Sequence, residues 1–250
     1  MDGKIAAPAF GARACGVLLI VVIVAYIFAD YAIGEALSYV SQSGQWHFLN
    51  NASELKIRAI KRILSGLSTP VLLVAVTLLV LREYFPQESP RLIFNRFGFE
   101  KRPTRKIILL SFAAGIVFVL FFTKVLMNFF PPGDLVNPNP AAIVSNSPFM
   151  AQLIFAINLV TLVPVAEEFL FRGVLYEGLS LSWNKFFAAV VVTFIFILVH
   201  PDALRSGYWV SHLALYTIPI LILAAREFTG SLYSPILIHS GFNFGSVFLS

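Results

Sequence analysis

A short charged segment interrupts an otherwise apolar part of the chain and carries the residues best suited to chemistry. Glu167, Glu168 and Arg172 follow directly after an uncharged run, residues 149–166. Ionisable groups inside or next to a membrane segment are costly and are normally functional. Glu168 and Arg172 are four residues apart, so on a helix they share a face and can form an ion pair. Glu167 is rotated by about 100° from Glu168, so we expect it to be the free, reactive carboxylate.

A histidine at the end of a later apolar run is predicted to lie at the same depth as Glu167. His200 directly follows the run, residues 186–199. If the chain turns near residue 182, Glu167 lies about 15 residues before the turn and His200 about 18 after it. At 1.5 Å per residue, both lie roughly 22–27 Å from the turn. Neighbouring antiparallel helices would therefore bring the carboxylate and the imidazole together.

The last predicted helix offers two more polar side chains on one face. His239 and Asn243 are four residues apart and so lie on the same side of a helix. Ser240 and Gly241 between them are small and allow another helix to approach closely. Two hydrogen-bonding groups opposite a glutamate and a second histidine indicate a catalytic cavity more than a simple contact between helices.

These four side chains support two mechanisms for hydrolysis of an amide bond. In the first, Glu167 and His200 act as general base and orienting group for a water molecule. His239 and Asn243 would then hydrogen-bond the developing oxyanion. In the second, Glu167, His200 and His239 bind a zinc ion that activates the water. The sequence contains no H-E-x-x-H helix and no evident serine or cysteine nucleophile motif beside these residues. Attack by an activated water is therefore favoured over an acyl-enzyme.

The composition places these residues in a helical membrane protein. Of the 250 residues, 58% are hydrophobic and 12% are charged, whereas soluble domains carry about 25% charged residues. The single cysteine excludes an intrachain disulfide. The long apolar runs predict an all-α, polytopic transmembrane bundle of seven helices, with room for an eighth within residues 34–62. The seven predicted helices cover roughly residues 14–33, 63–81, 107–130, 149–179, 185–200, 208–225 and 235–250.

The connections predict the orientation, the partners and the division of the chain. The net charge of +5 favours contact with anionic lipids over binding of nucleic acid. The most basic connection, residues 82–106, is placed in the cytoplasm by the positive-inside rule. The shorter basic cluster 56–62, across the second span, argues for the opposite orientation, and we follow the longer one. Within one membrane domain, a proline-rich connection separates residues 1–148, with the first spans and the basic loop, from residues 149–250, with every candidate catalytic residue.

Three motifs on successive predicted helices carry a resemblance to a known family. They are Glu167-Glu168-x-x-x-Arg172, Phe196-x-x-x-His200 and His239-x-x-x-Asn243. Together they resemble the CAAX protease and bacteriocin-processing (CPBP) family of intramembrane proteases. That family includes the type II CAAX prenyl endopeptidases and the Abi proteins. The resemblance covers roughly residues 149–250, and the first three spans resemble the family only as hydrophobic helices.

The resemblance implies an α-helical endopeptidase with its site in a cavity within the bilayer. It implies four catalytic residues and two supporting ones, namely Glu167, His200, His239 and Asn243, with Glu168 and Arg172 in support. Family members are described as metalloproteases, which implies zinc on Glu167, His200 and His239, although a glutamate-activated water has also been argued. The implied partners are membrane lipids and a peptide or membrane-associated protein, such as a prenylated CAAX protein or a bacteriocin precursor. The expected location is the prokaryotic plasma membrane.

Two other functions fit parts of the sequence. A non-catalytic immunity or scaffold protein would retain the fold and bind a peptide or partner, but it would not need all four candidate catalytic residues. A transporter with a proton relay through Glu167 would need ionisable residues on several spans on both sides of the midplane. The interiors of the first two predicted spans are expected to contain none.

Overall fold

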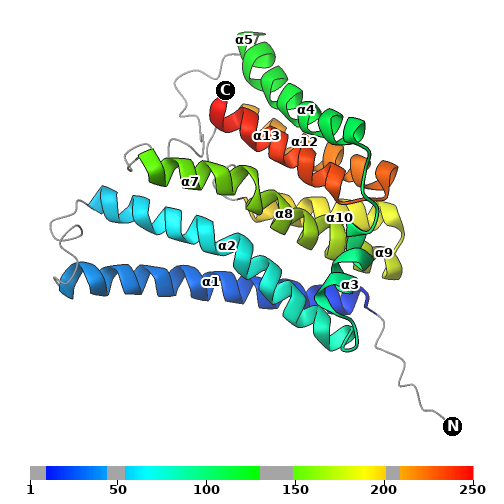
Figure 1. The fold of residues 1–250 in the computed structure, drawn as a ribbon, viewed down its shortest axis with the longest axis horizontal. Helices are drawn as coiled ribbons and strands as arrows, with labels where there is room; N and C mark the ends of the chain where they lie inside the picture. The colour runs from blue at the N-terminus through cyan, green and yellow to red at the C-terminus, as the bar shows by residue number, and fades with distance from the viewer. Residues whose placement is uncertain (1–9, 44–53, 130–148, 201–208, 250) are drawn as a thin grey trace.

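The chain folds into a bundle in which every described element is helical (Figure 1). This computed structural model describes residues 10–43, 54–129, 149–200 and 209–249. The first long stretches are α1 (Ala12–Ser43), α2 (Glu54–Tyr84), and α4 (Arg105–Leu120) continued by the π-helical η2 (Phe121–Leu126) and by α5 (Met127–Phe129). The next is α7 (Phe149–Val160), continued by α8 (Leu162–Glu168), the π-helical η3 (Phe169–Leu175) and α9 (Tyr176–Ser182). The last are α10 (Lys185–Leu198), α12 (Trp209–Thr229) and α13 (Tyr233–Phe248), while the short α3 (Pro90–Phe94) and η1 (Asn95–Phe99) lie between α2 and α4.

The helices confirm the predicted all-α membrane bundle. Four stretches are long and apolar enough to cross a membrane, namely Ala12–Gln42, Ala59–Tyr84, Arg105–Phe129 and Phe149–Ser182. Lys185–Leu198 is a shorter apolar helix. Among the described residues, the seven long stretches correspond to the seven predicted helices. The described part of 34–62 holds no additional helix, because α1 continues to Ser43 and α2 begins at Glu54, and residues 44–53 lie outside the described ranges.

The first helix is longer than predicted, and this changes the position of one acidic residue. Because α1 extends to Ser43, Asp30 lies in its interior. Its carboxylate pairs with Lys61 Nζ at 2.8 Å and accepts a hydrogen bond from Ser65 Oγ at 2.9 Å, both on α2. The expectation that the first two spans contain no interior ionisable residue is therefore wrong. The carboxylate is satisfied within the α1–α2 pair, so it stabilises the contact between these two helices.

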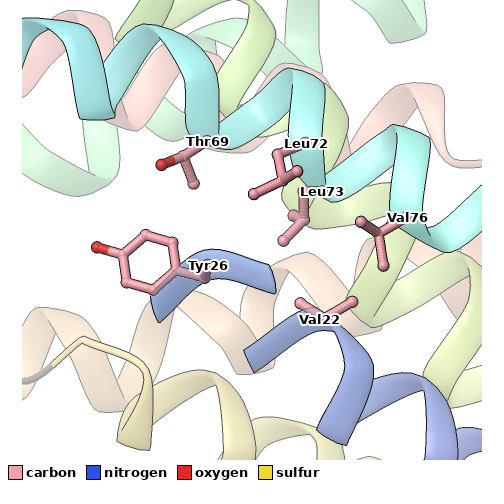
Figure 2. A pocket seen from close by; sticks show the side chains of 6 residues that line it. All are labelled: Val22, Tyr26, Thr69, Leu72, Leu73 and Val76. Atoms are coloured by element: carbon pink, nitrogen blue, oxygen red, sulfur yellow. The ribbon is translucent and has the colours of Figure 1, made fainter. Parts of the chain in front are cut away.

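An apolar slot lies between α1 and α2, one helical turn from Asp30 (Figure 2). Figure 2 shows six side chains that line it, namely Val22, Tyr26, Thr69, Leu72, Leu73 and Val76. The lining contains no carboxylate, imidazole or amine. The slot is therefore a region of loose packing between two helices, and it is separate from the predicted catalytic residues.

The helix that carries Glu167 lies in the middle of the bundle. In Figure 1, α7 and α8 run between the α1–α2 pair and α13, and they contact α2 on one side and α13 on the other. α10 contacts η3, α9 and α12. The stretch that carries Glu167 therefore contacts α13, which carries His239 and Asn243, and α10, which ends at Leu198 just before His200. This is the neighbouring arrangement that the approach of Glu167 and His200 requires.

α4 and α13 pack with their backbones in direct contact. A Cβ atom on Gly241 would lie 2.1 Å from the carbonyl oxygen of Phe112, and one on Gly115 would lie 2.0 Å from the carbonyl oxygen of Ile238. No side chain fits at either position, so the close approach depends on glycine. This confirms the prediction that Gly241 allows another helix to approach closely. The contact also fixes the backbone on both sides of His239.

Gly241→Ala should lower the free energy of unfolding by about 1–3 kcal/mol, because the added methyl group must force α4 and α13 apart. Thermal unfolding of the purified protein in detergent measures the effect. Gly16→Ala is the matched control, since a Cβ atom at Gly16 meets no atom within 4 Å. Gly16→Ala should leave the free energy of unfolding unchanged or raise it by up to about 1 kcal/mol, because alanine favours the helix. Equal melting temperatures for the two variants would contradict the close packing of α4 on α13.

Candidate active site

A break in the central helix precedes Glu167 by less than two turns. Pro164 has no amide hydrogen and its ring opposes the carbonyl four residues earlier, so it disrupts the preceding turn. The helix is accordingly interrupted at Thr161, whose φ and ψ are −114° and −70°. Near the break, the carbonyl oxygen of Leu159 accepts a hydrogen bond of 2.8 Å from Asn243 Nδ2 on α13. The bend is thus held by the same helix that carries His239.

A π-helical segment follows Glu168 directly. All seven residues of η3, Phe169–Leu175, are buried. Segments of this kind are rare and are frequent at functional sites. The ring of Phe169 packs 4.7 Å from that of Phe94, which lies between α2 and α4. The N-terminal half of the chain therefore supports the helix that carries the two glutamates, a contact that no motif or spacing in the sequence predicts.

The predicted ion pair is present and completely buried. Arg172 Nη1 donates to Glu168 Oε1 at 3.1 Å, and the side chains are 1% and 0% exposed. The same Glu168 oxygen lies 2.8 Å from His239 Nδ1. Glu168 therefore joins the ion pair to the last helix. The spacing along one helix predicted the pair with Arg172, but it could not reveal the bond to His239.

Three of the predicted catalytic residues converge. Glu167 Oε2 lies 4.0 Å from His200 Nε2 and 3.9 Å from His239 Nε2. These distances exceed the 2.7–3.2 Å range of a direct hydrogen bond. Glu167 Oε2 is buried and has no hydrogen-bond partner among the described residues. One small polar group between the three atoms would satisfy this oxygen, and the site is therefore shaped to hold a water molecule or an ion.

The outer hydrogen bonds of the two histidines determine which ring nitrogens face Glu167. His200 Nδ1 lies 2.7 Å from the carbonyl oxygen of Phe196, which can only accept. The Nδ1 atom of His239 faces the Glu168 carboxylate in the same way. Both Nδ1 atoms therefore carry hydrogen, and in the neutral rings both Nε2 atoms present lone pairs to Glu167. Three acceptors then meet without a donor, which is an arrangement that binds the hydrogens of a water molecule or a cation.

The donor set fits zinc in its chemistry but is too widely spaced as it stands. Two imidazole nitrogens and one carboxylate oxygen are common zinc ligands, and each histidine has the outer hydrogen bond typical of such ligands. Ligands at about 2.1 Å from a tetrahedral zinc lie about 3.4 Å apart, compared with 3.9 and 4.0 Å here. Among the described residues, no three His, Cys, Asp or Glu side chains form a group that could hold a metal. Zinc would require both histidines to move about 0.5 Å closer to Glu167.

The two remaining amides have distinct positions. Asn243 lies one turn after His239, partly buried, and uses one of its two amide hydrogens on Leu159. Its role as an oxyanion donor stays a prediction. Asn158 Nδ2 donates to the carbonyl oxygen of Gly66 at 2.9 Å, so it forms a hydrogen bond between α7 and α2.

The fold and the site together define the class of protein. The chain is an integral membrane protein whose helices bring two histidines within 4.0 Å of one glutamate oxygen. Residues 148–245 match the family model described as type II CAAX prenyl endopeptidase Rce1-like. This segment, which contains all six predicted site residues, belongs to the CPBP/CAAX family of intramembrane proteases. No curated protein and no solved structure matched the sequence.

Glu168→Gln should destabilise the protein by about 3–5 kcal/mol, because it leaves the buried Arg172 without its counter-charge. Thermal unfolding and the yield of folded protein in detergent measure the loss. Glu168→Gln combined with Arg172→Met should recover a large part of it. Lys185→Met serves as the control, because it removes an ion pair with Glu227 whose lysine is 69% exposed and should cost less than about 1 kcal/mol. A Glu168→Gln variant with the same melting temperature as the wild type would show that the Glu168–Arg172 pair does not stabilise the fold.

Proposed function

We propose that the chain is an intramembrane endopeptidase that hydrolyses a peptide bond with a water molecule activated by Glu167. The observation that carries the proposal is the position of Glu167 Oε2, which lies 4.0 Å from His200 Nε2 and 3.9 Å from His239 Nε2. Glu167 and His200 are 21% and 32% exposed, so part of each side chain lies at the surface of the bundle although Glu167 Oε2 is buried. Glu168 and Arg172 behind them are sealed from solvent and have a supporting role.

The proposed reaction begins with a water molecule between Glu167 and the two histidines. Glu167 takes a proton from the water molecule while the oxygen of the water attacks the carbonyl carbon of the peptide bond. His239 donates to the oxyanion when both of its ring nitrogens carry hydrogen, and Glu168 at 2.8 Å is the counter-charge for that form. Asn243, one turn further along α13, is the second proposed donor. The carbon–nitrogen bond then breaks, and the proton held by Glu167 passes to the leaving amine.

Zinc is the alternative way to activate the water. Glu167, His200 and His239 would hold the ion, which would supply a bound water of lowered pKa. The roles of Glu168 and of the Phe196 carbonyl would not change, because they orient the histidines in either scheme. The two schemes differ in whether the isolated protein needs a metal, so the distinction is open to a direct measurement.

The proposed substrate is a peptide or membrane-associated protein in the prokaryotic plasma membrane. The matched family is described as prenyl endopeptidases, so a prenylated CAAX-type C-terminus is the first candidate, and a bacteriocin precursor is the second. The candidate catalytic residues all follow residue 148, and we place the functional boundary there, within one bundle. A non-catalytic scaffold is disfavoured because it needs no buried carboxylate without a partner.

The basic connection 82–106 is proposed to face the cytoplasm. All of its lysines and arginines are exposed, namely Arg82, Arg91, Arg96, Lys101, Arg102, Arg105 and Lys106. Phe10, just before α1, packs on Phe97 within this connection, so the exposed Arg13 belongs to the same end of the bundle. A larger positive cluster at this end supports the proposed orientation.

Glu167→Ala should lower cleavage at least about 100-fold, because it removes the general base. The assay uses reconstituted protein and a farnesylated CAAX peptide with a fluorophore and a quencher on either side of the scissile bond. Glu100→Ala, at an exposed carboxylate in the basic connection, should leave turnover unchanged. Proteomic comparison of membranes that contain wild type or Glu167→Ala protein identifies substrates of other chemistry. Normal turnover by Glu167→Ala would overturn the catalytic assignment.

Treatment with a chelator should leave peptide cleavage unchanged, since the spacing of Glu167 and the two histidines is wider than zinc ligands require. The experiment combines metal analysis of the purified protein with activity before and after dialysis against 1,10-phenanthroline. Stoichiometric zinc, with activity that is lost on chelation and restored by added zinc, would replace the metal-free scheme with the zinc scheme.

A further inference from the structure

One aromatic side chain contacts both histidines of the candidate site. Phe196 is 3% exposed and lies on α10, four residues before His200, which follows the end of that helix. The centres of its ring and the His200 imidazole are 4.5 Å apart, with 35° between the planes. The His239 imidazole lies 6.2 Å away in an edge-to-face arrangement. The backbone carbonyl of Phe196 also accepts the hydrogen bond from His200 Nδ1, so this residue holds His200 at two points.

The same ring also contacts the buried guanidinium of Arg172. The guanidinium carbon of Arg172 lies over the Phe196 ring, 4.4 Å from its centre. Arg172 Nη1 is bonded to Glu168, but its Nη2 is buried and has no hydrogen-bond partner among the described residues. The face of an aromatic ring is electron-rich and attracts a cation most strongly where water is excluded. The ring of Phe196 therefore supplies part of the electrostatic stabilisation that the hydrogen bond to Glu168 leaves incomplete for Arg172.

We propose that Phe196 is a positioning residue that joins the buried Glu168–Arg172 pair to the two histidines through the electron-rich face of its ring. The ring holds Arg172, Arg172 holds Glu168, and Glu168 fixes the Nδ1 side of His239. The ring and the backbone of Phe196 fix His200 directly. Phe196 thereby controls the spacing at which the two Nε2 atoms face Glu167. This inference rests on the proposed function, because the site that Phe196 organises is the proposed hydrolytic site.

The experiment replaces Phe196 with phenylalanines that carry one, two or three ring fluorines, by site-specific incorporation. Fluorine withdraws electron density from the ring face and changes its size little. The kcat for the farnesylated CAAX peptide should fall stepwise with each fluorine, with KM within about twofold, and melting temperature should fall in the same order. Phe196→Leu, which removes the ring, should lower kcat about tenfold or more.

The same substitutions at Phe194 provide the control, since this residue lies on the same helix and is 59% exposed. They should change neither kcat nor melting temperature. If neither kcat nor the melting temperature changes with the number of fluorines at Phe196, the inference is overturned. It is also overturned if the melting temperature falls while kcat stays constant. If the wild-type protein cleaves no tested peptide, the proposed function fails. The melting series, which needs no substrate, still tests the contact between Arg172 and Phe196, and a flat result overturns it.

Discussion

The structure depends on one buried oxygen atom, Oε1 of Glu168, which accepts hydrogen bonds from Arg172 and from His239. Removing a carboxylate and a guanidinium from water is costly, and the pair persists only where hydrogen bonds replace the lost hydration. Here the replacement comes from two helices. The central helix supplies the ion pair, and α13 supplies the imidazole. The same contact that satisfies a buried charge therefore sets the orientation of a candidate catalytic ring.

The reactive side of the site follows from this constraint. Because Glu168 holds the Nδ1 side of His239, and the Phe196 carbonyl holds that of His200, both Nε2 atoms are turned toward Glu167. The scaffold supplies the rest. A proline breaks the central helix before Glu167, and Gly241 allows α13 to lie directly on α4. A carboxylate oxygen that lies about 4 Å from each of two imidazole lone pairs needs a small hydrogen-bond donor between them, and a nucleophilic water molecule meets that requirement.

The sequence could predict what depends on spacing within a helix or on depth along it. The Glu168–Arg172 pair follows from a four-residue interval, and the approach of His200 to Glu167 follows from equal distances to one turn. The bond between Glu168 and His239 joins residues 71 apart and depends on how α13 rotates against α8, which no local pattern encodes. The length of α1 was also missed, because the polar residues after position 33 continue the helix, which places Asp30 in its interior against Lys61.

The tautomers of His200 and His239 show whether Glu168 and the Phe196 carbonyl orient the two rings. Nitrogen-15 NMR of histidine-labelled protein in lipid nanodiscs distinguishes protonated from unprotonated ring nitrogens, and the signals are assigned with His→Gln variants. At a pH at which both rings are neutral, we predict hydrogen on Nδ1 and a bare Nε2 in both residues. Hydrogen on Nε2 and a bare Nδ1 in His239 would contradict it, since Glu168 could then not hold the ring that Glu167 faces.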